Sequence, residues 1–252
     1  MEVDPKKRFA NRGQYYDVYR PRYPKALLRY FVNELAFSQQ SVVADIGSGT
    51  GILSELLLGN GNQVFAVEPN DEMRRIAEAK LSSYRGFKSI SGSAESTTLP
   101  ADSVDLITAA QSFHWFVPGE TRVEFRRILR LNGWVALIWN TRKTSTPFLQ
   151  GYEALVDWLT SKRKNAVKHE DLSERAISEF LGKYKVIKLD NSQRLDLRGL
   201  IGRLSSASYS PLPTHPLYGE FVRRATELFE RYQQNGAITL DYWTEVYAGQ
   251  LS

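Results

Sequence analysis

The sequence predicts a doubly wound α/β fold with a mostly parallel sheet. Between residues 41 and 140, short apolar segments alternate with segments of helical periodicity, and the apolar segments lack the polar alternation of a half-exposed strand. Strands without that alternation, separated by helices, are typical of a parallel sheet covered on both faces. The chain has 252 residues, 42% of them hydrophobic, which suits one large domain or one domain with a cap.

The elements follow from this pattern in chain order. Short apolar runs predict strands at 41–46, 63–68, 87–91, 103–110 and 134–140, and apolar residues at helical spacing predict helices at 52–58, 71–81 and 121–130. After residue 140 the alternation changes. Helices are expected around 147–164, 172–181 and 218–234, with strands at 184–190 and 237–247.

Composition excludes several kinds of site. The chain has no cysteine, so disulfides, thiolate metal sites and cysteine nucleophiles are excluded, and its three histidines match no zinc spacing. No stretch approaches the roughly 18 consecutive apolar residues of a membrane span, and the first residues lack an apolar segment of the signal-peptide type. We therefore expect no metal, no membrane association and a cytoplasmic location.

The net charge of +5 raises the question of a nucleic-acid partner, because basic surfaces attract phosphate. The basic residues occur in short sets, at 6–8, 122–130 and 162–168, and do not form one stripe. This distribution favours solvated faces of surface helices. We expect no nucleic-acid partner.

A glycine-rich loop follows the first expected strand. Gly47, Gly49 and Gly51 stand at alternate positions in VADIGSGTGILS, between a strand and a helix. Glycine permits positive φ and lets a ligand pack against the backbone, and ligands of parallel sheets bind beyond the carboxyl ends of the strands. Ile52 stands where the dinucleotide fingerprint GxGxxG has its third glycine, and no Gly-Lys-Ser/Thr of a phosphate loop follows.

Glu68 ends the second expected strand, 17 residues after Gly51. An acidic side chain there can accept hydrogen bonds from both hydroxyls of a ribose. Its alternative role is a charge near the start of the next helix, which Asp71 and Glu72 fill more directly. An acid without the dinucleotide glycines indicates a nucleoside that carries no pyrophosphate.

Residues 41–140 resemble a class I S-adenosylmethionine-dependent methyltransferase. The resemblance rests on VVADIGSGTG, VFAVEPNDEM, ISGSAESTTLPADSVDLITAAQSFHWF and RRILRLNGWVALIWN, in that order. YDVYRPRYP and AQSFHWF are similar to the methyltransferase type 11, or trans-aconitate-methyltransferase-like, branch, and ITLDYWTEVYAG is similar to its closing strand. The chain departs from the family at Ser48, where Cys is common, and at 131–133, where Pro-Gly-Gly is common.

The resemblance implies a seven-stranded, mostly parallel, Rossmann-like sheet with an antiparallel last strand. Residues 1–40 would form an arm and helix over the cofactor site, and 41–252 the methyltransferase domain, with a helical cap inserted at about 195–236. The cofactor would be S-adenosyl-L-methionine, the product S-adenosyl-L-homocysteine, and no metal would be required.

The family pattern also implies contacts for the cofactor. The glycine loop, with Asp45 beneath it, would hold the amino-acid part of the cofactor, and Glu68 would hold the ribose. Arg20 would pair with the methionine carboxylate, although a solvated charge on the arm is the alternative. The expected contacts are Arg20, Asp45, Gly47, Ser48, Gly49, Gly51, Glu68, Pro69, Ser93, Ala94, Glu95, Ala110 and Gln111.

His114 is the candidate catalytic residue, as a base or as an orienting group. It follows the fourth expected strand, at the edge of the sheet where ligands bind. A base is required only where the accepting atom starts out protonated, as in a phenol or alcohol. The alternative is that FHWF is packing, with Trp115 capping the cofactor pocket. Trp115 and Tyr209 are the candidate substrate contacts.

The leading hypothesis is direct, in-line methyl transfer to a small-molecule acceptor by a monomer or homodimer. One alternative is a nucleic-acid (RNA) methyltransferase, although the chain lacks an Asn/Asp-Pro-Pro-Tyr motif and a concentrated basic face. Another is a non-catalytic S-adenosylmethionine-binding protein. His169 and His215 are expected at the surface or in loops.

Overall fold

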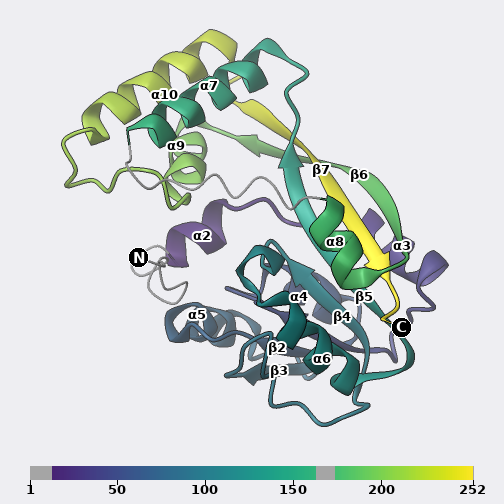
Figure 1. The fold of residues 1–252 in the computed structure, drawn as a ribbon. Coiled ribbons are helices and arrows are strands. Elements are labelled where there is room, and N and C mark those ends of the chain that lie inside the picture. Colours follow the sequence, from purple (N-terminus) through teal and green to yellow (C-terminus); the bar gives the residue numbers. More distant parts are fainter. Residues whose placement is uncertain (1–12, 163–173, 252) are drawn as a thin grey trace.

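The computed structural model describes residues 13–162 and 174–251 (Figure 1). These residues form a seven-stranded sheet in the order β3-β2-β1-β4-β5-β7-β6. The strands are β1 (Val42–Ile46), β2 (Gln63–Val67), β3 (Phe87–Ile90), β4 (Val104–Ala110), β5 (Leu129–Arg142), β6 (Tyr184–Leu195) and β7 (Ile238–Gly249).

The first five strands are parallel and β7 is antiparallel to both of its neighbours, β5 and β6. The predicted fold class, a doubly wound and mostly parallel sheet with an antiparallel last strand, is therefore confirmed. The register sets Asp45 of β1 beside Thr108 of β4. The strands β1, β2 and β4 all end at the same edge, which is where the sequence predicted the ligand site.

Helices cover both faces of the sheet. On one face, α3 (Ala26–Glu34), α4 (Ile52–Gly59) and α5 (Asp71–Leu81) pack with inward residues such as Val43 and Val64. On the other, α6 (Pro118–Ile128) and α8 (Glu174–Leu181) pack with Ala44, Ile46 and Ile107. Successive residues of a strand point to opposite faces, so a strand buried on both sides shows no polar alternation.

A third apolar cluster lies beyond the end of the sheet. It joins α7 (Pro147–Ser161), α9 (Leu197–Ser205) and α10 (Tyr218–Tyr232) to Leu195 of β6 and to Ile238, Leu240 and Tyr242 of β7. In Figure 1, β5, β6 and β7 extend from the parallel sheet to this group of helices. We call α7, α9 and α10 the cap; α9 and α10 fall within 195–236, and α7 comes from the preceding connection between β5 and β6.

The helix α2 (Gly13–Tyr19) lies between the cap and α5 (Figure 1). It contacts α9 on one side and α5 on the other. Tyr19 fills the space beside Gly202 of α9, where an added Cβ would lie 2.5 Å from the tyrosine ring. Lys80 of α5 donates a 2.6 Å hydrogen bond to Asp17. The segment from α2 through residue 25, called the arm here, thus connects the cap to the parallel sheet.

Several boundaries differ from the sequence-based expectations. β6 is longer than expected because it continues along β7 to Leu195, whereas β5 begins earlier, at Leu129 beside Val104 of β4, and ends two residues later beside β7. A 3-10 helix at Phe113–Trp115 was not expected, since three residues carry no periodic signal. At 131–133, where the sequence departs from the family, β5 contains Asn132 at φ 65° and its register to β4 shifts. His169 and the ends of the two expected helices near it lie outside the described residues.

Candidate functional site

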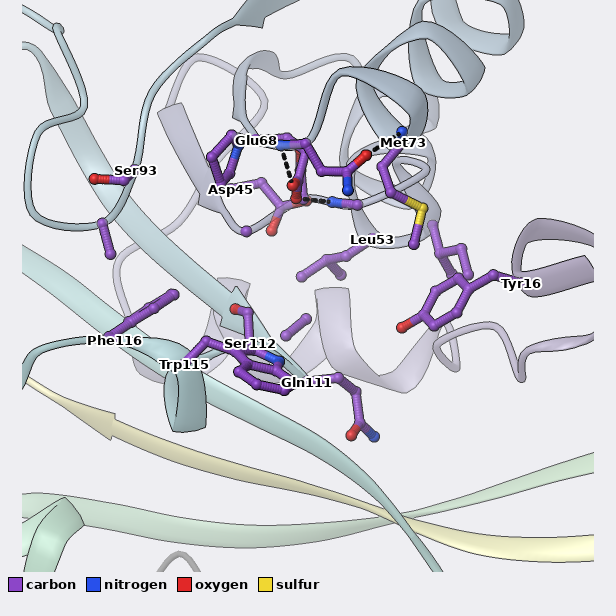
Figure 2. Close-up of a pocket in the computed structure, with 18 of the residues that line it drawn as sticks. Tyr16, Asp45, Leu53, Glu68, Met73, Ser93, Gln111, Ser112, Trp115 and Phe116 are labelled. Atoms are coloured by element: carbon purple, nitrogen blue, oxygen red, sulfur yellow. Dashed lines mark hydrogen bonds between the residues drawn. The ribbon is translucent and has the colours of Figure 1, made fainter. Parts of the chain in front are cut away.

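A cavity of about 250 Å³ lies at the carboxyl ends of β1, β2 and β4. We call it the inner cavity. Figure 2 shows residues that line it: Glu68 and Asp45 at the top of the view, Gln111 below, and the rings of Phe116 and Trp115 on the side opposite Tyr16. The predicted contacts that line it are Asp45, Gly47, Ser48, Gly49, Glu68, Pro69, Ser93, Ala94, Glu95, Ala110 and Gln111.

The glycine loop wraps the end of β1 with three positive φ angles, 67° at Gly47, 57° at Gly49 and 76° at Gly51. An added Cβ at Gly49 would meet no atom within 4 Å. At Gly51 it would lie 2.5 Å from Leu81 Cδ1, and Gly51 does not line the cavity. Gly49 therefore leaves room on the ligand side, and Gly51 allows α4 to pack against α5.

Asp45 lies beneath this loop and is 1% exposed. Its carboxylate accepts a 2.6 Å hydrogen bond from Ser54 Oγ and a 2.9 Å hydrogen bond from Thr108 Oγ1. Burial raises the pKa of Asp45 from 3.8 to about 6, and the two hydroxyl donors oppose that rise. The direct partners of Asp45 are thus hydroxyls of α4 and β4.

Glu68 lies immediately after β2 with both carboxylate oxygens fixed by backbone amides. Gly49 N–H donates to Oε2 at 2.9 Å and Asn70 N–H donates to Oε1 at 2.8 Å (Figure 2). Burial raises the pKa of Glu68, and the two amides partly offset this rise. Each oxygen keeps a further lone pair for donors of a ligand. The sequence therefore predicted correctly that Glu68 stands at the end of the second strand, whereas its hydrogen bond with Gly49 of the glycine loop was seen only in the structure.

Two other lining residues have different local partners. Ser48 Oγ is buried and has no hydrogen-bond partner in the part of the chain that the structure describes. Glu95 accepts hydrogen bonds from Val117 N–H at 2.9 Å and Thr121 Oγ1 at 3.4 Å, at the start of α6, and hydrogen bonds lower the pKa of Glu95 although burial alone would raise it. The glutamate thus holds the start of that helix while it lines the cavity.

A second cavity, of about 560 Å³, lies between the arm, the cap and β5. We call it the outer cavity. Tyr16, Tyr23, Ile52, Gln111 and Trp115 line both cavities, so the two adjoin. A small-molecule site commonly has a volume of about 300–1,000 Å³.

The outer cavity collects the remaining sequence candidates. His114 and Tyr209 line it, as does Trp115, whose ring centroid is 4.9 Å from that of His114. Arg20 also lines the outer cavity and does not line the inner one. The structure therefore brings Arg20 together with the candidate substrate residues, and its pairing with the methionine carboxylate stays a prediction.

Sequence reasoning missed several lining residues. In the inner cavity these include Tyr16, Asn70 and Ser112. The position of Asn70, two residues after Glu68, could have indicated that it lines the cavity, whereas Tyr16 comes from the arm, far away in sequence. In the outer cavity they include Asn140, Arg142, Glu153, Arg203 and Glu245, which come from β5, α7, α9 and β7. Arg203 lies in a helix whose sequence gives no sign that this face is buried.

Within residues 13–162 and 174–251, no three or more His, Asp or Glu side chains are grouped so that they could hold a metal ion. In the same residues, no helix has the length and apolar character required to cross a membrane.

The comparisons with known proteins found methyltransferases. Residues 44–137 match a family described as "Methyltransferase domain". An uncharacterized methyltransferase-like protein of Schizosaccharomyces pombe is 31% identical over 136 residues, or 54% of this chain and 52% of that protein. An uncharacterized methyltransferase of Mycobacterium tuberculosis is 35% identical over 127 residues, or 50% and 49%. The match thus spans about half the length of these curated relatives.

Solved structures extend the likeness of the fold to nearly the whole chain. A proposed type II methyltransferase from Anaeromyxobacter dehalogenans superposes with a TM-score of 0.72 at 22% identity, covering 93% of this chain and 99% of that one. A methyltransferase from Geobacter sulfurreducens, solved with S-adenosyl-L-homocysteine, gives 0.50 at 16% identity, covering 98% of each chain. Residues 44–137 therefore match a methyltransferase domain, and the fold of the chain is the fold of these solved methyltransferases.

Proposed function

We propose that the chain transfers a methyl group from S-adenosyl-L-methionine to a small-molecule acceptor. The observation that carries the proposal is the pair of adjoining cavities, the inner one lined by Glu68 and the glycine loop and the outer one by His114 and Tyr209. The first would hold the cofactor and the second the acceptor.

The inner cavity suits a nucleoside that carries an amino acid. Glu68 offers free lone pairs to ribose hydroxyls, and the buried Ser48 Oγ has no hydrogen-bond partner among residues 13–162 and 174–251. The positive φ at Gly49 and the open space beside it let a ligand approach the backbone. Trp115 and Tyr16 present aromatic rings that attract a cation such as a sulfonium.

When bound, S-adenosyl-L-methionine supplies a methyl group that is already activated for displacement. The protein then has to hold the acceptor atom in line and exclude water. Trp115 and Tyr16 border both cavities, so they would fix the two ligands relative to each other. His114 would accept a proton from a hydroxyl acceptor or orient it.

The basic residues occur in short sets along the sequence, which does not favour a nucleic-acid acceptor, and the outer cavity has the size of a small-molecule site. We therefore keep the RNA acceptor, and the binding protein without turnover, as outcomes of the test. A cytoplasmic location and a monomeric or homodimeric state stay predictions.

The test begins with calorimetric titration of S-adenosyl-L-homocysteine into wild type and Glu68→Gln. The variant amide replaces one acceptor oxygen with a donor that faces Gly49 or Asn70 N–H, and a hydrogen bond to a charged group contributes about 1.5–3 kcal/mol. We expect an affinity loss of about tenfold to a hundredfold. Glu179→Gln, a 65% exposed side chain on α8, is the matched control and should bind as wild type.

Transfer is then measured with radiolabelled cofactor and separate pools of small acids, phenols and RNA. Label in a small-molecule pool supports the proposal, and label in RNA alone would replace it. Normal affinity for S-adenosyl-L-homocysteine with no label in any pool would favour the non-catalytic alternative. Unchanged affinity of Glu68→Gln would remove Glu68 from the site.

A further inference from the structure

Gln111 stands where the inner and outer cavities adjoin. It follows β4 directly and lines both cavities. Its backbone is left-handed, with φ 58°, an angle that is unfavourable for residues other than glycine. Among the residues that the structure describes, no other non-glycine residue with a positive φ lines either cavity. An unfavourable angle that is kept at a ligand site suggests that the side chain it directs has a role there.

Two backbone carbonyls of β5 fix this residue. Gln111 N–H donates to the carbonyl of Ile138 at 2.9 Å, and its side-chain Nε2 donates to the carbonyl of Asn140 at 3.3 Å. A carbonyl oxygen can only accept, so the NH₂ end of the amide has to face Asn140. Asn140 is held in turn, because its Oδ1 accepts from Thr244 Oγ1 at 2.6 Å and from Asn191 Nδ2 at 3.2 Å. The orientation of the Gln111 amide is thus set by β5, β6 and β7.

The other end of the amide, Oε1, is available to a ligand. Among residues 13–162 and 174–251 no group donates to Oε1, and the atom is not fully buried. In Figure 2 the Gln111 side chain extends away from Glu68 and Asp45. Because Gln111 also lines the outer cavity, its amide extends toward the proposed acceptor site.

The other residues that line both cavities select a ligand group less strictly. Ile52 has no polar side-chain atom and Trp115 has only an N–H donor, whereas the hydroxyls of Tyr16 and Tyr23 can both donate and accept. Gln111 Oε1 can only accept. This oxygen therefore favours a ligand that presents an O–H or N–H group where the two cavities meet.

Resting on the proposed function, we infer that Gln111 orients the acceptor by accepting a hydrogen bond from the O–H or N–H group that becomes methylated. The acceptor is then an alcohol, a phenol or an amine. Oε1 holds the hydrogen to one side, so that a lone pair of the same atom faces the methyl carbon. As the bond to this carbon forms, the carbon–sulfur bond breaks and the proton leaves to His114 or to water.

The test measures ligand binding by NMR titration of the full chain in the presence of S-adenosyl-L-homocysteine. The probes are phenol and aniline, each compared with fluorobenzene, and 1-butanol, compared with its isomer methyl propyl ether. The aromatic probes suit the rings of Trp115, Trp139 and Tyr247 in the outer cavity. We expect wild type to prefer the probes with O–H or N–H. Gln111→Leu should weaken their binding by about twofold to tenfold, the size of a neutral hydrogen bond, and keep that of fluorobenzene and the ether.

Gln150→Leu is the matched control. Nε2 of Gln150 also donates to a backbone carbonyl at 3.3 Å, that of Thr144, but Gln150 is exposed and lines neither cavity. This variant removes the same kind of hydrogen bond and should keep the preference for O–H and N–H probes. Gln111→Asn tests reach, because asparagine tolerates the left-handed angle but carries its amide one methylene closer to the backbone. It should keep the stability and lose most of the preference.

Stability measurements separate this role from a structural one. Gln111→Gly removes the amide and relieves the left-handed angle, so its unfolding temperature should be unchanged or higher while the preference is lost. Equal binding of the paired probes to wild type, or a preference that survives in Gln111→Leu, would overturn the inference. A lower unfolding temperature of Gln111→Gly with that surviving preference would assign the amide a structural role.

The cofactor analogue supplies a further readout. Gln111→Leu should bind S-adenosyl-L-homocysteine as wild type does, because the amide extends away from Glu68. Loss of this affinity with an unchanged probe preference would overturn the inference in favour of a cofactor contact. If wild type does not bind S-adenosyl-L-homocysteine, the proposed function fails, and the probe preference measured without it still decides whether Gln111 selects O–H and N–H groups.

Discussion

Asp45→Asn tests the energetic cost of the buried carboxylate beneath the glycine loop. Asparagine has nearly the same shape and can still accept from one hydroxyl and donate to the other, so the hydrogen bonds with Ser54 and Thr108 can be kept. What the substitution removes is the ionisation. The pKa of Asp45 is raised by burial from 3.8 to about 6.

The sign follows from proton binding. Because the folded state holds the proton more tightly than the unfolded chain, the contribution of Asp45 to stability is complete below pH 3.8 and is lost as the pH rises through about 6. The difference between these two pKa values corresponds to about 3 kcal/mol of unfolding free energy. Asparagine escapes this loss.

The assay is urea denaturation of wild type and Asp45→Asn at several pH values from about 4 to about 8. Ionisations that do not sense Asp45 cancel in the difference between the two proteins; Glu68 is an exception, because the charge of Asp45 helps to raise its pKa. We expect the variant to gain about 3 kcal/mol relative to wild type across this range, with most of the change between about pH 4 and 7. Ser54→Ala keeps Asp45 but removes a donor to its carboxylate, so this variant should lose more unfolding free energy than wild type as the pH rises. A difference that stays constant with pH would refute the reasoning.

Two other substitutions test local roles. Gly51→Ala places a left-handed alanine at φ 76° and brings its Cβ within 2.5 Å of Leu81 Cδ1, so we expect about 1–3 kcal/mol lower stability and unchanged affinity for S-adenosyl-L-homocysteine. Gly49→Ala is also left-handed, but its Cβ enters open space, so this variant should lose less stability and more affinity. The reverse order of the two variants in calorimetry and denaturation would contradict these roles. His114→Gln should lower turnover with a hydroxyl acceptor by about 10²–10⁴-fold at unchanged S-adenosyl-L-homocysteine affinity, and unchanged turnover would remove its catalytic role.

The inner cavity was largely predictable because its parts are local in sequence. Gly49 and Glu68 each stand directly after a buried strand, and in a parallel sheet the carboxyl ends of neighbouring strands meet at one edge. Gln111 follows β4 in the same way. Pattern and topology rules together place these residues at one site before any side-chain contact is known. Gly51 shows the limit, since only the packing of Leu81 distinguishes its role from that of Gly49.

By itself, the sequence determined the order of strands and helices and the kind of ligand edge, because burial on both faces and special backbone angles leave a mark on nearby residues. Only the tertiary structure decided the outer cavity. Arg20 and Arg203 stand 183 positions apart and both line this cavity, and no short-range pattern connects their two segments. They meet because β7 pairs between β5 and β6 and carries the cap over the arm, and no local pattern encodes which helix face that contact buries.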